Sequence, residues 1–317
     1  MTVPPFDEAR SIELVVTDIR ALHAPIEHLG RQFREAIAHD PENQQPSAGG
    51  RSGRHWSRVA YTDSLARLRL FVEQNFNYVE SIGLLALARY VFELTVWLKL
   101  MQRDSRYGIV YYRELISKQL NHYRDLRDHL TREVAFLREI DAHERMLLHA
   151  RLKEGMELSD QEARRNTLSR LSIDVMREID RAAARRFSLY GEQSRINGYG
   201  FQADLIETKV LPSVVQSIEE IEREQRLFDN NVPLDIKSLA KPWKWKPQAR
   251  LVDMEHEYDF IYSYTSRLLH ATPASLTTDQ KNLEPREVLV FLRYVHVRLL
   301  EIIDMARQVP VAEPAHE

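Results

Sequence analysis

The sequence predicts an all-α protein: a helical bundle with a long projecting antiparallel helical hairpin, a coiled-coil-like arm. Apolar residues recur at helical spacing over most of the chain, and no segment shows the alternation of a strand. Only 10 Gly and 13 Pro occur among 317 residues, which argues against sandwiches, barrels and glycine-rich nucleotide loops. With 44% hydrophobic and 29% charged residues, the chain is globular and can bury a sizeable core.

Residues 1–104 are expected to form the N-terminal part of the bundle. Residues 6–39 have helical periodicity, and the Gly- and Pro-containing residues 40–54 predict a flexible connector. The periodicity resumes at Trp56 and continues into the most apolar segment of the chain, residues 81–101. We expect these two helices to form a hairpin.

Residues 105–190 are predicted to form the arm. No proline interrupts its first helix, and Ile116, Tyr123, Leu130 and Leu137 repeat every seven residues. A second helix with one apolar stripe follows a break near Ser159. Because so narrow a seam suits one partner helix and often dimerises, we expect a homodimer or a protein partner to assemble through this arm.

Residues 201–308 are predicted to complete the bundle, and residues 309–317 to be a disordered tail. The expected elements are a helix from Ala203 to Phe228 kinked at Pro212, an irregular stretch at 229–247, and helices at 249–270 and 285–308. Pro285 is expected in the first turn of the last helix.

Composition excludes several classes of function. The absence of Cys removes disulfides, thiolate metal sites and cysteine nucleophiles, and the net charge of −3 gives no overall attraction to nucleic acid. The N-terminal residues do not resemble a signal peptide, and charged residues interrupt the apolar helix at 81–101, so we expect a cytoplasmic protein with no membrane span. Neither metal nor cofactor motifs are present, and none is expected.

The most unusual local feature is a charge pair, Arg89 and Glu93, inside that apolar helix. The two side chains are four residues apart and share a face, and the apolar surroundings predict that they are at least half buried. Burial of unpaired charge costs several kcal/mol, roughly, so the pair needs partners or a function.

A second polar group lies near the end of the helix predicted at 249–270. Ser263, Ser266, Arg267 and His270 share a face there, and the helix dipole favours the protonated form of His270. Convergence with Glu93 would create an acid–base site. The alternative is a helix-terminal histidine beside surface Arg and Ser residues.

The segment 241–247 alternates lysines with Trp243 and Trp245. Such a pattern can stack nucleic-acid bases and hold phosphates. Tryptophans in this context can equally fix a loop to the bundle.

Two resemblances follow from these residues. The pattern Arg89-x3-Glu93, followed by Trp243 or Trp245 and by Tyr262, Ser266 and His270, is similar to a bacterial family of all-helical proteins of unknown function. More remotely, the helical arrangement resembles HEPN proteins, many of which are metal-independent ribonucleases in bacterial defence. Their signature has an Arg with a His four to six residues later.

Arg267 and His270 are closer together than that signature requires, whereas Arg124 and His129 fit its spacing but lie on the predicted arm. The HEPN resemblance implies RNA as a possible partner and a defence- or stress-associated function. It implies catalytic roles for His270 as acid–base group, Arg267 or Arg89 as charge stabiliser and Glu93 as orienting group. Tyr262, Ser266, Trp243 and Trp245 would bind the substrate.

The competing hypothesis is a non-catalytic helical assembly or sensor module that acts through a protein partner. In that case Arg89 and Glu93 only fix how the helices pack.

Overall fold

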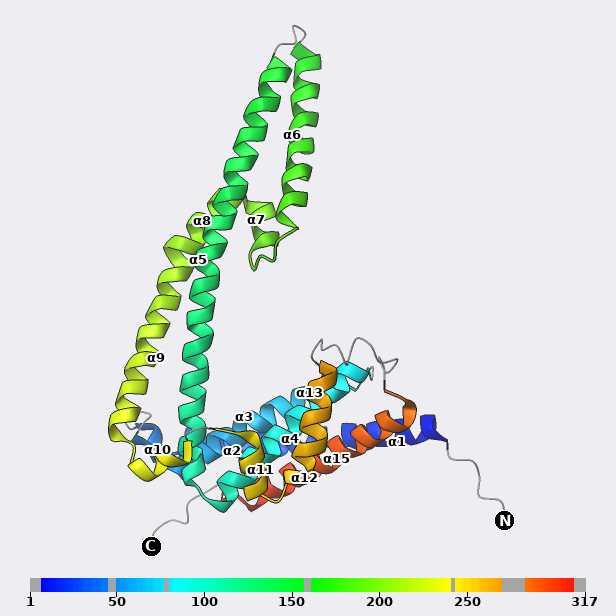
Figure 1. Cartoon of the computed structure of the whole chain (residues 1–317), viewed down its shortest axis with the longest axis vertical. Helices are drawn as coiled ribbons and strands as arrows, with labels where there is room; N and C mark the ends of the chain where they lie inside the picture. Colours follow the sequence, from blue (N-terminus) through cyan, green and yellow to red (C-terminus); the bar gives the residue numbers. More distant parts are fainter. Residues whose placement is uncertain are drawn as a thin grey trace. The chain divides into compact units, whose positions relative to one another are not determined.

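The computed structural model describes residues 7–44, 50–76, 80–156, 161–240, 243–269 and 283–310 (Figure 1). No strand occurs in these ranges, so the all-α prediction is confirmed. The helices are α1 (Glu8–Ala21), α2 (His23–Ala38), α3 (Gly53–Gln74), α4 (Ser81–Arg103), α5 (Arg106–Met156), α6 (Gln161–Ala183), α7 (Gly191–Asn197), α8 (Tyr199–Leu205), α9 (Leu211–Asn231), α10 (Leu234–Ala240), α11 (Trp245–Leu251), α12 (Glu255–Glu257), α13 (Ser263–Leu269) and α15 (Pro285–Gln308). A 3-10 turn, η1 (Pro41–Gln44), and two π-helical turns, η3 (Ile206–Val210) and η4 (Tyr258–Tyr262), complete the elements.

The chain divides into two compact units, Met1–Leu115 with Arg226–Glu317, and Ile116–Gln225. The second unit contains most of the predicted arm and also residues 191–225, which the sequence analysis did not include in the arm. The reason is that α8 and α9 pack on the same apolar seam of α5 as α6 does. That the hairpin projects from the bundle stays a prediction.

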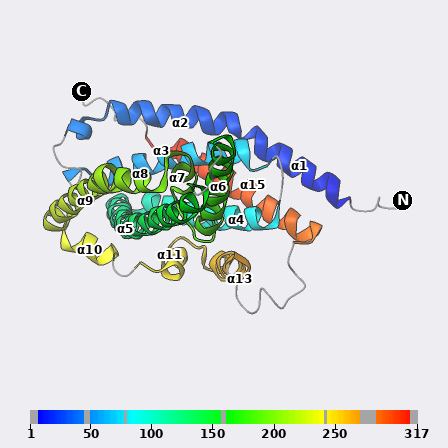
Figure 2. The same cartoon turned by 90° about the horizontal axis from the view of Figure 1, so that it is seen from above.

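The first unit is built around α4. This helix packs against α15, α3 and α13, and α2 covers α3 (Figure 2). Val91, Phe92 and Val96 of α4 are completely buried. Thr95 is also completely buried, and its hydroxyl donates a hydrogen bond of 2.7 Å to the carbonyl of Val91, so no polar group is stranded there.

By length and composition, α4 is the one helix in the described ranges that could cross a membrane. Half of its most apolar window is buried inside the protein. The core helix of a globular protein can have the same length and composition, so this finding is weak evidence for a membrane-spanning helix.

The helical periodicity of residues 6–39 is divided between two helices, α1 and α2, with a break at Leu22. Pro25 explains the break. It has no N–H to donate to the carbonyl of Ala21, and its ring would clash with that carbonyl in a continuous helix. The cap is completed instead by Leu22, whose N–H donates to Ile19 at 3.0 Å.

Much of the predicted connector at 40–54 has defined structure, because Glu42 and Ser52 tie its two ends together. The Ser52 hydroxyl donates to the Glu42 carboxylate at 2.7 Å and accepts a hydrogen bond of 3.2 Å from the His55 N–H, which caps α3. Residues 45–49 of the connector lie outside the described residues.

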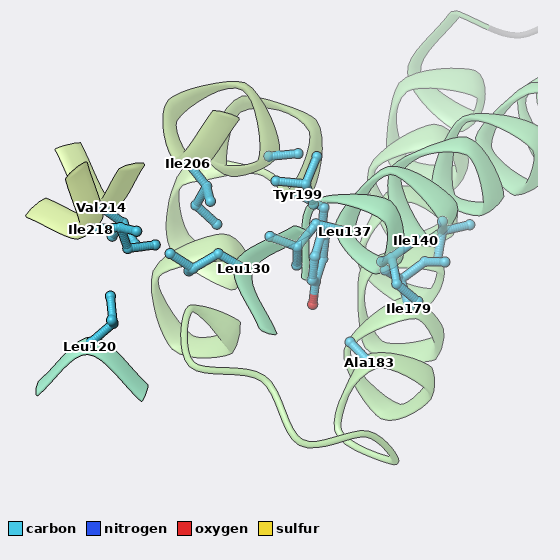
Figure 3. Packing of buried hydrophobic residues seen from close by; sticks show 13 residues of the cluster. Leu120, Leu130, Leu137, Ile140, Ile179, Ala183, Tyr199, Ile206, Val214 and Ile218 are labelled. Atoms are coloured by element: carbon cyan, nitrogen blue, oxygen red, sulfur yellow. The ribbon is translucent and has the colours of Figure 1, made fainter. Parts of the chain in front are cut away.

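The second unit has its core along α5. Leu130 and Leu137 of α5 are buried among Ile179 of α6, Tyr199 of α8 and Ile206 of η3 (Figure 3). The predicted heptad positions Leu130 and Leu137 of α5 therefore belong to one core. Residues of α6, and of α8, η3 and α9, complete this core.

Pro212, at which the sequence predicts a kink, lies in the second unit, and the kink itself stays a prediction. The π-turn η3 ends at Val210, and Pro212 stands in the first turn of α9. A π-turn is a recognised cause of a kink, and the first turn of a helix tolerates the missing N–H of proline.

Two predictions for the C-terminal part were wrong. The described residues of 229–247 are not irregular, because they include the end of α9, all of α10 and the start of α11. The helix predicted at 249–270 is interrupted after Leu251, where Asp253 has a φ of 57° and the Met254 N–H donates to the Ala249 carbonyl at 2.8 Å. This is a Schellman-type end, and Asp tolerates the left-handed conformation better than most residues.

The last helix agrees with its prediction. Pro285 lies at the start of α15, and Glu284 and Glu287 form a reciprocal capping box. Of the predicted disordered tail, residues 311–317 lie outside the described residues.

Glycine allows the first turns of α3 and α5 to touch. A Cβ atom at Gly108 would lie 2.1 Å from the carbonyl oxygen of Gly53 and 2.9 Å from the backbone nitrogen of Ser57. Backbone atoms cannot move aside as a flexible side chain can, so any larger residue must separate the two helices.

We predict opposite effects for two glycine substitutions. Gly108→Ala should lower the free energy of unfolding by about 1–3 kcal/mol, because the added carbon overlaps the backbone of α3. Gly30→Ala should raise it by about 0.5–1 kcal/mol, because a Cβ within α2 would make ordinary contacts at 3.5 Å or more. Urea unfolding of both variants measures the difference, and equal effects would contradict the packing.

Candidate functional site

The site begins with the charge pair on α4. The Arg89 Nε donates to the Glu93 carboxylate at 3.0 Å, and the two side chains are 25% and 28% exposed. Both charges are therefore mostly withdrawn from water, as the apolar sequence around them indicates. A hydrogen bond between charged groups in such a setting is stronger than one in full solvent.

Arg89 also binds α13 and η4. Its Nη1 donates to the Ser266 hydroxyl at 3.1 Å, and its guanidinium carbon lies 4.3 Å from the centroid of the Tyr262 ring. Residues 173 or more positions apart in the chain thus meet at one guanidinium. The resemblance implied a shared site for Arg89, Glu93, Tyr262 and Ser266, and the structure brings these four together.

The two tryptophans of the 241–247 segment lie beside this group. Trp243 stacks on Trp97 of α4 at 3.9 Å with a 7° interplanar angle, and Trp245 meets Trp243 edge-on at 5.6 Å. The Trp245 ring is 6.5 Å from that of Tyr262. Trp243 therefore fixes its segment to the bundle, and its face against Trp97 is not open to a stacking base.

Of the other two predicted catalytic residues, Arg267 is described by the structure and His270 is not. Arg267 is exposed on α13, next to Ser266 but not among the groups that contact Arg89 in the described residues. His270 lies outside the described residues. Its convergence with Arg89 and Glu93 stays a prediction.

Arg124 and His129, which fit the HEPN spacing, each face a carboxylate within the second unit. Arg124 donates to Glu222 at 2.6 Å, and the His129 Nε2 lies 3.5 Å from the carboxylate of Glu133. Glu133 is buried and also accepts hydrogen bonds from Ser188 and from the backbone N–H of Tyr190. These contacts serve the packing of the second unit.

A cavity of about 210 Å³ adjoins Glu93. Aliphatic side chains line part of it, and its aromatic and charged lining residues are Asp63, Arg67, Tyr90, Glu93, Trp97, Tyr111 and Trp245. Desolvation by the surrounding protein raises the pKa of the Asp63 carboxyl, although Arg67 opposes the shift. Burial raises the pKa of Tyr111 to about 12, so this phenol keeps its proton at neutral pH.

In the stretches that the structure describes, no three His, Asp or Glu side chains are grouped so that they could hold a metal ion. Comparisons with protein-family models, curated proteins and solved structures found no match. The resemblances to the all-helical bacterial family and to HEPN proteins therefore stay predictions.

The sequence analysis missed a second polar cluster at the start of α3. Asp40, His55 and Arg58 are all buried, with the His55 Nδ1 2.9 Å and the Arg58 Nη1 3.3 Å from the same Asp40 oxygen. The Glu42 N–H donates to the other Asp40 oxygen at 2.9 Å. A signal was present, because His55 and Arg58 lie three residues apart on one helix face, but their carboxylate partner stood in the segment assigned to a flexible connector.

Asp40 supplies the negative charge of this cluster. Burial acts to raise the pKa of its carboxyl, but the hydrogen bonds from His55 and Glu42 and the charges of His55 and Arg58 outweigh it, so the pKa lies below its usual range. The ionised carboxylate is thus the form that the fold stabilises.

We predict that the Arg89–Glu93 pair stabilises the fold and that its exposed counterpart on α3 does not. Glu93→Gln should lower the free energy of unfolding by about 1–3 kcal/mol, because Arg89 loses its charged partner while partly buried. The control Glu73→Gln removes the partner of Arg69, an i,i+4 pair at 3.5 Å with side chains 37% and 51% exposed, and should change it by less than about 0.5 kcal/mol. Guanidinium unfolding at fixed salt compares the two, and equal losses would show that burial is unimportant.

The lowered pKa of Asp40 leads us to predict that the stability of the protein depends on pH. A carboxyl whose pKa is lower in the folded state stabilises the protein above its unfolded pKa, near 3.9, and this stabilisation is lost as the pH falls through the folded pKa. Asp40→Asn should therefore destabilise the protein at pH 7, and the difference from the natural chain should shrink below about pH 4. Asp63→Asn should have the opposite sign or no effect at pH 7, because the pKa of Asp63 is raised. Urea unfolding across pH 3–7 tests both.

Proposed function

We propose that this protein is a non-catalytic helical module that assembles with a second copy of itself through the far part of the α5–α6 hairpin. One observation carries the proposal. Within residues 141–153 of α5 and 161–174 of α6 no residue is buried, although the segments contain several large apolar side chains. Those side chains are Met146, Leu147, Leu148, Leu152, Leu168, Leu171 and Ile173.

Two helices alone give a hairpin little core. Nearer to α8, the same two helices bury Ile140, Val175 and Ile179 because further helices contribute to the cluster. Beyond that point α5 and α6 lie side by side without a third helix of the second unit (Figure 1). A pair of such hairpins that share a four-helix core would bury the remaining apolar faces.

A second copy fits this surface better than a partner of strong charge. Acidic and basic residues alternate on both helices, for example Asp141 and Arg145 on α5 and Arg170 and Asp174 on α6. An interface on a two-fold axis places a surface against itself, which a mixture of charges permits and a single sign would oppose.

The Arg89 site supports the same reading. Its guanidinium is engaged by Glu93, Ser266 and Tyr262, so it holds α13 and η4 to α4. An arginine that stabilises a charged phosphorane needs donors directed at the substrate. The ribonuclease function implied by the HEPN resemblance depends on His270 and stays a prediction.

We predict that the purified full chain is a dimer, with a mass near twice 37.2 kDa by light scattering. The double variant Ile173→Glu/Met176→Glu should be a monomer, because it places charge on an exposed apolar face of α6. The control Val290→Glu/Val297→Glu changes two equally exposed residues of α15 and should remain dimeric. Unchanged helicity by circular dichroism in each variant excludes unfolding as the cause.

A monomeric natural chain at tens of micromolar would contradict the proposed assembly, as would a dimer that the α6 variant does not dissociate. The non-catalytic part has its own test. Cleavage of labelled single-stranded RNA by the natural chain, lost in a stably folded His270→Ala variant, would overturn it and favour the ribonuclease.

A further inference from the structure

A second, larger cavity lies at the start of α3, in the first unit. Its volume is about 380 Å³, within the range of small-molecule sites. Residues of α3, the end of α4, the turn before α5 and the end of α15 line it: Arg54, Ser57, Arg58, Tyr61, Met101, Gln102, Ser105, Gln308, Val309 and Pro310.

The charge of this cavity has one sign. Among the residues that line it, the charged ones are Arg54 and Arg58. Arg58 is mostly buried, and its Nη1 contacts Asp40 at 3.3 Å. A guanidinium has five N–H donors, so one contact with Asp40 orients the group and leaves it donors for a ligand.

Asp40 is positioned to hold Arg58 and does not line the cavity itself. It also contacts His55, whose side chain is completely buried. The carboxylate therefore offsets the burial cost of Arg58 from behind, while the cavity side remains positive.

Tyr61 provides an independent observation. It is 1% exposed, lines the cavity, and has a buried hydroxyl that finds no hydrogen-bond partner among the residues that the structure describes. Its ring stacks on Phe33 at 5.6 Å, which fixes its position. Burial raises the pKa of this phenol, so the hydroxyl retains its proton and is a donor.

A buried donor without an acceptor is costly, and an anionic ligand would supply the acceptor. From the two arginines and the hydroxyl of Tyr61, we propose that the cavity binds a small organic phosphate, with the phosphate group between Arg54, Arg58 and Tyr61. Arginine forks match phosphate oxygens in geometry. Met101 and Pro310 offer apolar surface to the organic part. This site is independent of the proposed assembly and lies in the other unit.

The test is calorimetric titration of the full chain with inorganic phosphate, adenosine 5′-monophosphate and citrate as probes. We expect saturable binding of one or both phosphate probes, and a rise in melting temperature in their presence. Tyr61→Phe should weaken binding about tenfold or more, through the loss of a hydrogen bond to a charged acceptor. Arg54→Gln should do the same.

The Tyr61→Phe variant also has a stability readout. Without ligand its melting temperature should equal or exceed that of the natural chain, because the substitution removes an unpartnered buried hydroxyl and keeps the ring on Phe33. The control Arg69→Gln removes an exposed charge from the same helix and should bind the phosphate probes as the natural chain does.

Three results would overturn the proposal. In the first, neither phosphate probe binds saturably. In the second, citrate binds and the phosphate probes do not. In the third, the Tyr61→Phe and Arg54→Gln variants bind phosphate as well as the natural chain does. Each can occur whether or not the protein dimerises, so this test and that of the assembly fail separately.

Discussion

The first unit depends on the burial of α4. A helix of 23 residues with so few polar side chains is stable in water only if other helices cover most of its surface. The polar groups of α4 then need partners, and two of them find partners on covering helices. Arg89 reaches Ser266 of α13, and Lys99 forms an ion pair of 2.7 Å with Glu301 of α15. These contacts fix which face of α4 each neighbour covers, which the hydrophobic effect alone does not specify.

Helical periodicity, capping and proline predicted most elements of this fold. The predictions of α4 and α15 were good because each has a long apolar pattern, and α15 also has Pro285 and its capping box. The failures have local causes. Pro25 breaks a helix whose apolar pattern continues through it, and Asp253 ends α11 by a backbone conformation that no periodicity reveals.

The candidate sites show a different limit. Arg89 and Glu93 are neighbours on one helix turn, so the sequence predicts their pairing directly. Ser266 was a candidate from its polar helix face and Tyr262 from a resemblance, but the contact of either residue with Arg89, more than 170 residues away, follows only from tertiary packing. Neither helix spacing nor a resemblance pointed to Asp40. A single acid beside glycines and prolines resembles any surface turn, and only the folded chain shows that it lies against the buried His55 and Arg58.

The two arginine sites of the first unit differ in what they leave for a ligand. At Arg89 the chain supplies a carboxylate, a hydroxyl and an aromatic face, and these contacts hold α13 and η4 to α4. At Arg58 the chain supplies one carboxylate, and a cavity with a second arginine and a buried phenol adjoins it. Because a buried donor that lacks an acceptor is costly, the proposed anion would have a larger effect on stability at Arg58 than at Arg89. Under the two proposals above, the unusual charge pair in the sequence has a structural role, and the ligand site lies at a cluster that the sequence does not make conspicuous.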